Sequence, residues 1–235
     1  MIKQIHRANS RGYANHGWLK SYHTFSFANY YDSERMNFGM LRVLNDDVVQ
    51  PKMGFGTHPH KNMEIISIPI SGALSHKDSM NNKRAIEVGE VQLMSAGTGL
   101  THSEFNDSKT DEVNFLQIWI IPEKLDVTPF YDQKLFVENG RKNQFQVLVS
   151  PRTNLVKDSL PINQQAYISM IDLDKGFDID YHLKNSAYFF LIDGEIQIED
   201  EKLEKRDAIG ISEIDKIQLK ANQNSKLLVI DVPIN

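Results

Sequence analysis

Short apolar runs separated by turn residues recur along the whole chain. Within many runs apolar and polar positions alternate, which is typical of β-strands that bury one face. No amphipathic helical pattern extends beyond about three turns. The pattern therefore predicts an all-β protein, with strands expected at residues 23–27, 39–44, 64–70, 73–78, 85–88, 91–95, 113–121, 144–150, 165–172, 177–183, 187–192, 195–198, 208–211, 216–219 and 225–232.

The breaks between these runs contain residues that favour turns. Asn, Asp and Gly tolerate the backbone conformations of tight turns better than other residues do. We therefore expect the chain to reverse direction at Asn45-Asp46-Asp47, Asn81-Asn82, Gly97-Thr98-Gly99 and Asp193-Gly194.

A weak internal repeat divides the chain into two halves. When Gly72 is aligned with Gly194 and Ser95 with Ser212, the strands and turns around them correspond. A boundary is expected near residues 122–143, where prolines and a polar stretch interrupt the strands. Because this segment does not look like a flexible linker, we expect two barrels of one design that pack against each other.

Composition and charge narrow the function classes. The formal net charge is −5 and no basic stripe is visible, which argues against direct binding of nucleic acid. No apolar run approaches the ~20 residues that a membrane helix requires. The first residues, MIKQIHRANSRGYANHG, are polar and mixed, unlike a signal peptide. We therefore expect a cytoplasmic protein that does not bind membranes.

The chain has no cysteine. This excludes disulfides, thiol nucleophiles and iron–sulfur clusters. Any metal ion would have to be held by nitrogen and oxygen atoms, which makes the histidines and carboxylates the residues to examine.

A first histidine pair, His58 and His60, follows a glycine-rich segment. Because side chains alternate along a strand, the two imidazoles share a face and can bind one ion. Pro59 between them predicts an edge or irregular strand. The pair alone is weak evidence, since eight histidines in 235 residues produce one by chance in roughly one sequence in four.

A second pair, His102 and Glu104, follows the glycine-containing turn at residues 97–99. Its two side chains also share a face, together with Asn106. Two strands that each carry paired ligands are much more specific than either one alone. The four residues together therefore predict a metal site.

The choice of carboxylate stays open on spacing alone. Glu64 has the same parity as His58 and His60, so it could point to the ion as well as Glu104 could.

The remaining histidines and nearby aromatic residues carry weaker signals. Single histidines without ligand spacing usually have structural roles, although His23 could orient a metal-bound imidazole. We expect structural roles for His6, His16, His23 and His76. Phe55, Phe25 and Phe27 could line an apolar pocket, but such rings more often belong to the core.

The two halves differ at the candidate ligands. In the repeat alignment His58 falls on Asp180, His60 on His182, His102 on Leu219 and Glu104 on Ala221. The second barrel has therefore lost the metal-binding set, and His182 is expected to be a structural or surface residue.

Several segments together resemble the pirin family of bicupins, and most closely its short bacterial members. The resemblance is dense over residues 1–135, whereas the later residues match in length and strand pattern only. It rests on His23-Thr-Phe-Ser-Phe27, Leu41-Arg-Val-Leu-Asn-Asp-Asp47, Gly54-Phe-Gly-Thr-His-Pro-His60, Met63-Glu-Ile65, Met94-Ser-Ala-Gly-Thr-Gly99, His102-Ser-Glu104 and Gln117-Ile-Trp-Ile-Ile-Pro122.

The resemblance implies an all-β bicupin of two packed jelly-roll barrels. Residues 1–135 would form a metal-binding cupin domain, and residues 136–235 a degenerate cupin domain without metal. The family's metal ligands fall on His58, His60, His102 and Glu104. Glu64 would then lie beside the ligands rather than on the metal. The resemblance suggests Fe(II) as the one divalent ion, while such ligands also accept Mn, Co, Ni, Cu or Zn.

The resemblance also implies a function. Short bacterial members are associated with quercetin 2,3-dioxygenase activity, in which O2 cleaves a flavonol ring and carbon monoxide is released. The substrate would be a small flavonol-like aromatic molecule, and Glu104 would also be the catalytic base. The alternative is a non-enzymatic, metal-dependent redox sensor that binds a protein partner, as eukaryotic pirins resemble transcriptional co-regulators. A cupin isomerase is a third possibility, because one fold hosts many chemistries.

Overall fold

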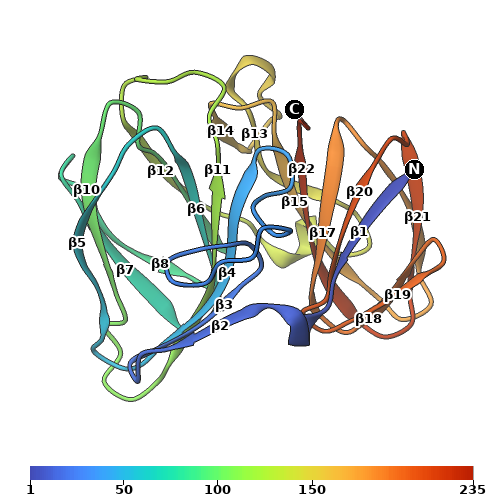
Figure 1. The fold of residues 1–235 in the computed structure, drawn as a ribbon, viewed down its shortest axis with the longest axis horizontal. Helices are drawn as coiled ribbons and strands as arrows, with labels where there is room; N and C mark the ends of the chain where they lie inside the picture. Colours follow the sequence, from blue (N-terminus) through green and yellow to red (C-terminus); the bar gives the residue numbers. More distant parts are fainter. Residues whose placement is uncertain (235) are drawn as a thin grey trace.

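The computed structural model describes residues 1–234 and places them in two β-barrels that lie side by side (Figure 1). Each barrel consists of a seven-stranded sheet and a four-stranded sheet. The helical segments of the described residues are three short 3-10 turns, namely η1 (Ala8–Ser10), η2 (Glu138–Gly140) and η3 (Arg152–Asn154). The predicted all-β fold with two packed barrels is therefore confirmed.

The N-terminal barrel contains the strands that carry the candidate ligands. In spatial order its larger sheet contains β12 (Phe130–Leu135), β9 (Glu90–Ser95), β6 (Glu64–Ser71), β11 (Val113–Ile120), β4 (Leu41–Val49), β3 (Leu19–His23) and β2 (Gly12–Asn15). Its smaller sheet contains β5 (Gly54–His60), β10 (Leu100–Phe105), β7 (Ala73–Asp78) and β8 (Lys83–Glu87).

The C-terminal barrel repeats this arrangement. Its larger sheet contains β1 (Ile2–His6), β20 (Ala208–Ser212), β17 (Ser186–Asp193), β22 (Ser225–Val232), β15 (Tyr167–Leu173), β13 (Gln146–Pro151) and β14 (Leu160–Ile162). Its smaller sheet contains β16 (Asp178–His182), β21 (Lys216–Ala221), β18 (Glu195–Ile198) and β19 (Glu201–Glu204). Read in order, the strands of the two barrels correspond, except that β14 runs parallel to β13 whereas β2 runs antiparallel to β3.

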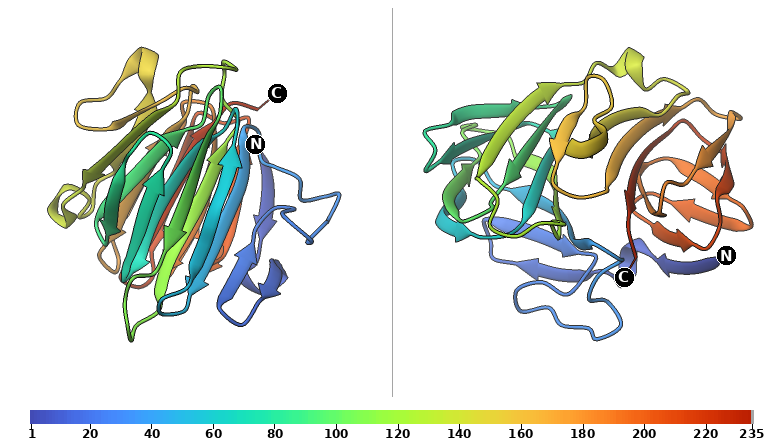
Figure 2. Two further views of the ribbon diagram at one scale, coloured as in Figure 1. Left: turned by 90° about the vertical axis from the view of Figure 1, so that its left-hand side faces the viewer. Right: turned by 90° about the horizontal axis from the view of Figure 1, so that it is seen from above.

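The first strand of the chain departs from the expected division into residues 1–135 and 136–235. β1 pairs with β20 over its whole length and so belongs to the C-terminal barrel (Figures 1 and 2). It takes the edge position that β12 takes in the N-terminal barrel. The sequence did not indicate β1, because its pairing partner lies about 200 residues away and the strand is only partly buried.

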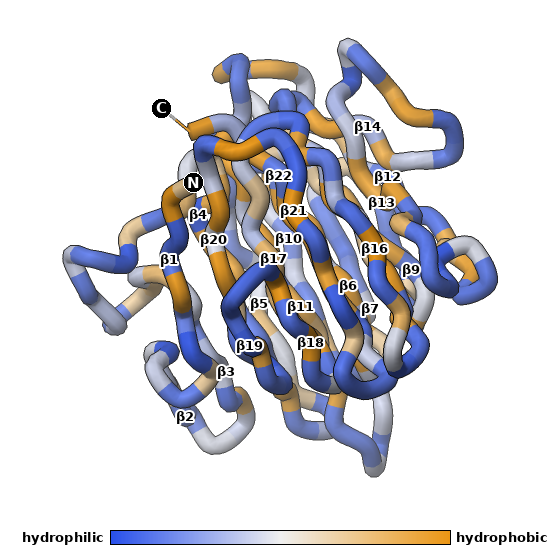
Figure 3. The backbone as a smooth tube through the Cα atoms, turned by 90° about the vertical axis from the view of Figure 1, so that its right-hand side faces the viewer, coloured by the Kyte–Doolittle hydropathy of each residue, from blue (hydrophilic) through white to orange (hydrophobic). Residues whose placement is uncertain are grey.

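Apolar side chains form two main cores. One lies between the two large sheets and joins the barrels, with Leu44 and Ile118 from one barrel and Leu148 and Ile230 from the other. The second fills the inside of the C-terminal barrel. Hydrophobic and hydrophilic positions alternate along β16, β18 and β21, which bury one face and expose the other (Figure 3).

The turn predicted at Asn45-Asp46-Asp47 is wrong, because all three residues lie within β4. The contacts of Asp46 show how this strand can carry a buried carboxylate. Its carboxylate lies 3.1 Å from the guanidinium of Arg206 and 3.4 Å from that of Arg11, and all three side chains are largely buried. A buried carboxylate is tolerated when it is paired and hydrogen-bonded.

The repeat alignment is wrong at β16. It matched His58 and His60 with Asp180 and His182, but both of the latter side chains are exposed. Tyr181 is buried within the core of the C-terminal barrel, and Ile179 packs against that core. The inward positions of β16 are therefore one residue earlier than the alignment placed them.

Strand pairing gives the correct correspondence. Ile179 pairs with Leu219 across β16 and β21, as His58 pairs with His102 across β5 and β10. The error arose because three residues separate His60 from Glu64 at the start of β6, whereas four separate Tyr181 from Ser186 at the start of β17. The counterparts of His58, His60, His102 and Glu104 are Ile179, Tyr181, Leu219 and Ala221.

Candidate metal centre

Three histidine side chains meet inside the N-terminal barrel. His58 and His60 lie on β5, and His102 lies on the neighbouring strand β10, opposite His58. The Nε2 atom of His102 is 3.0 Å from the Nε2 atoms of both His58 and His60. The histidines of the two sequence pairs are therefore brought together at one point.

The separation of these nitrogen atoms fits a single metal ion. Imidazole nitrogens bind such ions at about 2.0–2.1 Å, which puts two ligand atoms roughly 2.9 Å apart at a right angle and roughly 3.4 Å apart at the tetrahedral angle. The observed separation of 3.0 Å falls in this range. The three histidines therefore form a site that suits a divalent metal.

The protonation state of the histidines also favours metal binding. Burial, with the neighbouring histidines, lowers the pKa of His102 to about 2 and the pKa of His60 to about 4. Both rings are therefore neutral at physiological pH and can offer a lone pair to a metal. The Nδ1 atom of His58 lies 2.8 Å from the carbonyl oxygen of Gly56 and donates to it, which leaves its Nε2 lone pair free.

Glu104 borders this cluster through His102. A carboxylate oxygen of Glu104 and ring nitrogens of His76 and His102 lie within 4.8 Å of one another, and this group shares His102 with the three-histidine group. The Gln117 amide donates to one oxygen of the Glu104 carboxylate at 3.0 Å, and the Ser67 hydroxyl donates to the other at 3.2 Å. Burial raises the pKa of Glu104 to about 7, although both hydrogen bonds lower it.

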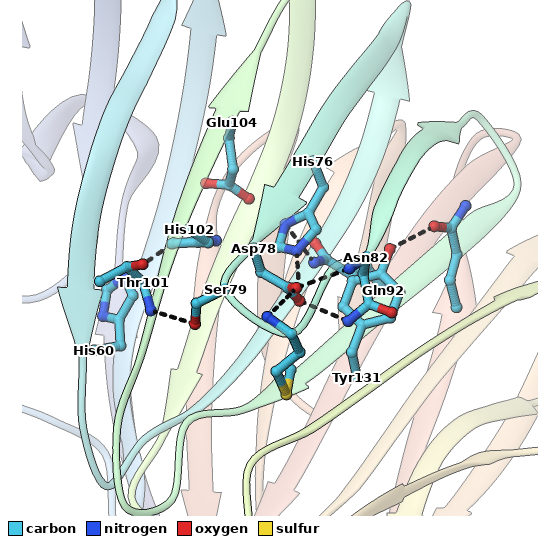
Figure 4. Close-up of polar contacts among 12 residues, drawn as sticks. His60, His76, Asp78, Ser79, Asn82, Gln92, Thr101, His102, Glu104 and Tyr131 are labelled. Atoms are coloured by element: carbon cyan, nitrogen blue, oxygen red, sulfur yellow. Dashed lines mark hydrogen bonds and ion pairs between the residues drawn. The ribbon is translucent and has the colours of Figure 1, made fainter.

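His76 is a neighbour of the site that sequence reasoning assigned a purely structural role. It lies on β7 directly opposite Glu104 on β10, and its ring is 5.3 Å from the ring of His102. Its Nε2 atom lies 3.2 Å from the Asp78 carboxylate, and the Gln92 amide lies 2.9 Å from its Nδ1 atom (Figure 4). These contacts fix the ring beside Glu104. Only the register of β7 against β10 could have indicated this position.

Polar side chains continue across the inner face of the large sheet. In spatial order this polar row consists of His23, Asn45, Gln117, Ser67, Gln92 and Gln133, each paired with the next across neighbouring strands. All six are buried. Burying polar groups costs stability unless they are hydrogen-bonded. An unbroken row of buried polar side chains adds little to stability. It therefore favours an interior that binds a ligand.

A cavity of about 540 Å³ opens onto the histidines and Glu104. This volume lies in the range of about 300–1,000 Å³ that is usual for small-molecule sites. Aromatic rings with flat faces suit a flat ligand. The aromatic side chains that line the cavity are Tyr13, Trp18, Phe27, Tyr30, Phe55 and Trp119.

The phenylalanines named from the sequence divide between cavity and core. Phe27 and Phe55 line the cavity, whereas Phe25 is buried in the core between the barrels. His6 also lies there, with its Nδ1 atom 2.6 Å from the hydroxyl of Tyr188. Its expected structural role fits this position.

A second buried carboxylate, Asp47, lines the same cavity. The hydroxyl of Ser21 on β3 donates to it from the directly paired position. Burial raises the pKa of Asp47 to about 7; the Ser21 hydrogen bond lowers it, and the charges of Asp46 and Glu104 raise it. Sequence reasoning missed Asp47, because it interpreted residues 45–47 as a turn. Alternation along β4 would have placed Asn45 and Asp47 on one face.

Glu64 lies outside the site, contrary to the expectation that it lies beside the ligands. Its carboxylate accepts hydrogen bonds from Ser95 at 2.6 Å and from the backbone and side chain of Asn163 at 3.2 and 3.3 Å. The parity argument failed because residues 61–63 carry the chain from the small sheet to the large one. Alternation holds only within one strand.

Family models match both halves of the chain. The family model described as Pirin matches residues 4–120, and the model of the quercetinase C-terminal cupin domain matches residues 147–232.

No helix of residues 1–234 has the length and apolar character needed to cross a membrane.

Three relatives illustrate the similarity over the full length. The chain is 41% identical to a quercetin 2,3-dioxygenase of Escherichia coli (strain K12), over 97% of this chain and 98% of the relative. It is 38% identical to a pirin-like protein of Caulobacter vibrioides, over 94% and 95% of the two chains. The crystal structure of the bacterial pirin YhhW from Escherichia coli in complex with nickel(II) superposes with a TM-score of 0.94 at 39% identity and covers 100% of both chains.

Proposed function

The chain belongs to the pirin family, and on this premise we propose that it is a metal-dependent dioxygenase of the quercetin 2,3-dioxygenase type. Its substrates would be a flavonol-like aromatic molecule and O2, and the flavonol ring would be cleaved with release of carbon monoxide. The observation that carries the proposal is one cavity in which three converging histidines and a buried glutamate share the walls with aromatic rings.

We propose His58, His60, His102 and Glu104 as the ligands of one divalent ion, with Fe(II) as the native metal. The nickel-bound relative supports a divalent ion, and nitrogen and oxygen ligands also accept Mn, Co, Cu and Zn. When bound, the ion would supply Lewis acidity and a template that holds both substrates. In this proposal residues 1–135 carry the site, and residues 136–235 stabilise it.

We assign Glu104 a second role as the base that accepts the proton of a substrate hydroxyl. Gln117 and Ser67 hold its carboxylate in one orientation. Glu104 lines the cavity, so its carboxylate can meet the hydroxyl of a bound substrate. The aromatic walls would bury the flat rings of the substrate and keep water away from them.

Oxygen uptake on quercetin tests the proposal. Metal-free protein would be loaded separately with Fe(II), Mn, Co, Ni, Cu and Zn, and each form assayed with an oxygen electrode. We expect metal-dependent uptake that disappears in His60→Ala and persists in His182→Ala, whose histidine lies exposed on β16. An absence of uptake with every fully bound metal would contradict the dioxygenase proposal and favour a metal-dependent sensor that binds a protein partner.

The role of Glu104 has its own test. Glu104→Gln keeps the shape of the side chain but removes its basicity. Because general bases contribute about 10²–10⁴-fold to rate, we expect the turnover number to fall by about that factor. Metal content and carbon monoxide release would be measured on the same sample. A variant that keeps both its metal and its rate would refute the assignment.

A further inference from the structure

We infer that Asp47, together with Ser21 and Asn45, forms a second recognition point in the cavity that binds a phenolic hydroxyl of the substrate. This inference rests on the proposed function and specifies the substrate class further. It predicts that the enzyme selects flat aromatic molecules that carry a hydroxyl group in addition to the one beside the metal ligands.

The two sheets of the N-terminal barrel contribute different chemistry to the cavity. The proposed metal ligands come from β5 and β10 of the small sheet, whereas Ser21, Asn45 and Asp47 come from β3 and β4 of the large sheet. Ser21 pairs with Asp47 across these strands, and its hydroxyl donates a hydrogen bond to the Asp47 carboxylate. A ligand that fills the cavity therefore meets metal ligands on one wall and hydrogen-bond acceptors on the other.

The wall of β3 and β4 has side-chain polar atoms without hydrogen-bond partners. The Ser21 hydroxyl donates to one oxygen of Asp47, and among residues 1–234 no group donates to its other oxygen. Behind this wall, the side-chain oxygen of Asn45 and the Nδ1 atom of His23 are buried and also lack partners. Buried polar atoms in folded proteins are usually paired, so an unpaired set on a cavity wall needs an explanation. A ligand that donates hydrogen bonds supplies one.

The shape of the cavity indicates the kind of donor. The rings of Trp18 and Phe55 pack edge to face with centroids 5.2 Å apart, and those of Phe27 and Trp119 do so at 5.3 Å. Such walls hold a flat ring and leave its rim free to reach Asp47. A neutral phenolic hydroxyl fits both walls.

Two flavonols separate this subsite from the metal ligands. Quercetin carries hydroxyl groups around both of its ring systems, whereas 3-hydroxyflavone keeps only the hydroxyl next to its carbonyl. Their affinities for Ni(II)-loaded protein would be measured by isothermal titration calorimetry without oxygen, so that no turnover interferes. We expect the wild-type protein to prefer quercetin by at least about tenfold, the effect of one or two hydrogen bonds.

Substitution of Asp47 should remove this preference. Asp47→Leu keeps a side chain of similar shape without an acceptor, and we expect its two affinities to agree within about twofold. Its affinity for 3-hydroxyflavone should stay within about threefold of the wild-type value. Asp47→Asn keeps one acceptor oxygen and should show an intermediate preference, which also serves if the leucine variant does not fold. Asp180→Asn, an exposed carboxylate of the other barrel, is the matched control and should keep the full preference.

The outcomes distinguish this inference from the proposed function. Equal wild-type affinities, no binding of either flavonol, or a preference that survives in Asp47→Leu would overturn the subsite. A preference that Asp47→Leu abolishes, in a protein that does not consume oxygen with quercetin, would support the subsite and contradict the dioxygenase. Oxygen consumption together with equal affinities would support the dioxygenase and contradict the subsite.

Discussion

Six positions run across the inner face of the large sheet in each barrel, and the two sets of side chains differ in polarity. In the N-terminal barrel they form the polar row His23, Asn45, Gln117, Ser67, Gln92 and Gln133. In the C-terminal barrel the strand pairing puts Val147, Ser169, Val229, Phe189, Ile209 and Ile5 at the corresponding positions. One framework therefore holds either a polar interior or an apolar one.

The small sheets show the same contrast. Where the N-terminal barrel has three converging histidines and Glu104, the C-terminal barrel has Ile179, Tyr181, Leu219 and Ala221 within or against its core. Among residues 1–234, the groups of side chains that could hold a metal all lie in the N-terminal barrel. The comparison teaches that strand order does not determine function in this fold. The residues that face inward determine whether a barrel can bind a ligand or mainly adds stability.

The largest effect on stability is expected from truncating a core side chain of the C-terminal barrel. Phe189→Ala should lower the free energy of unfolding by about 3–5 kcal/mol, because it removes a fully buried ring from a closely packed interior. Urea denaturation of the metal-free protein would measure this. The folded variant should bind metal as the wild type does. A weakened metal site in the folded variant would show that the core of the C-terminal barrel also shapes the metal site and does more than add stability.

The core between the two barrels should make the stability of the protein depend on pH. Burial is the largest cause that lowers the pKa of His6 to about 4, below its ordinary value of 6.5. Between these pH values the unfolded chain takes up a proton that the folded protein does not, so stability falls as the pH falls from about 6.5 to about 4. The loss from His6 should reach up to about 3 kcal/mol.

The variant His6→Gln isolates this contribution. It keeps a polar group near Tyr188 but cannot titrate. Unfolding of metal-free wild type and variant would be compared from pH 7 to pH 4, so that His60 and His102 affect both proteins equally. The stability of the variant should fall less steeply. If the stability of both proteins falls equally steeply with pH, protonation of His6 does not cause the loss.

A smaller effect is expected from the polar row itself. Ser67→Ala removes a hydroxyl that orients Glu104 and should lower metal affinity by about 10–100-fold, as is typical for groups that orient metal ligands. The stability of the metal-free protein should change by no more than about 1 kcal/mol. A competition assay with a chelator would measure the affinity. Ser169→Ala, at the corresponding row of the other barrel, should leave it unchanged.

The smallest effect is expected at the outer face of β16. Asp180 lies 3.0 Å from Lys216, but both side chains are exposed. Asp180→Asn should therefore change stability by less than about 1 kcal/mol and leave metal binding intact. A large loss of either would contradict the corrected register, which directs Asp180 to solvent and Ile179 inward.

Parts of the site could be predicted because they depend on one strand at a time. Alternation within β5 and within β10 was enough to pair His58 with His60 and His102 with Glu104. The same argument failed for Glu64, since the chain changes sheets before that residue. The all-β pattern was likewise visible, because alternation and turn residues are local signals.

Other parts depend on which strands become neighbours. His76 gains its position from the pairing of β7 with β10, and Ser21 meets Asp47 through the pairing of β3 with β4. β1 pairs with a strand at the far end of the chain. No local pattern encodes these registers. The polar row became visible only after the strands had been put in spatial order.

The central claim is that one divalent ion binds in the N-terminal barrel and that the other barrel binds none. The most direct test is the metal content of protein that has been loaded with Ni(II) and dialysed, measured by elemental analysis for wild type, His102→Ala and His182→Ala. The account predicts one ion per chain in the wild type and in His182→Ala, and none in His102→Ala. A full equivalent of metal in His102→Ala, or its loss in His182→Ala, would contradict it.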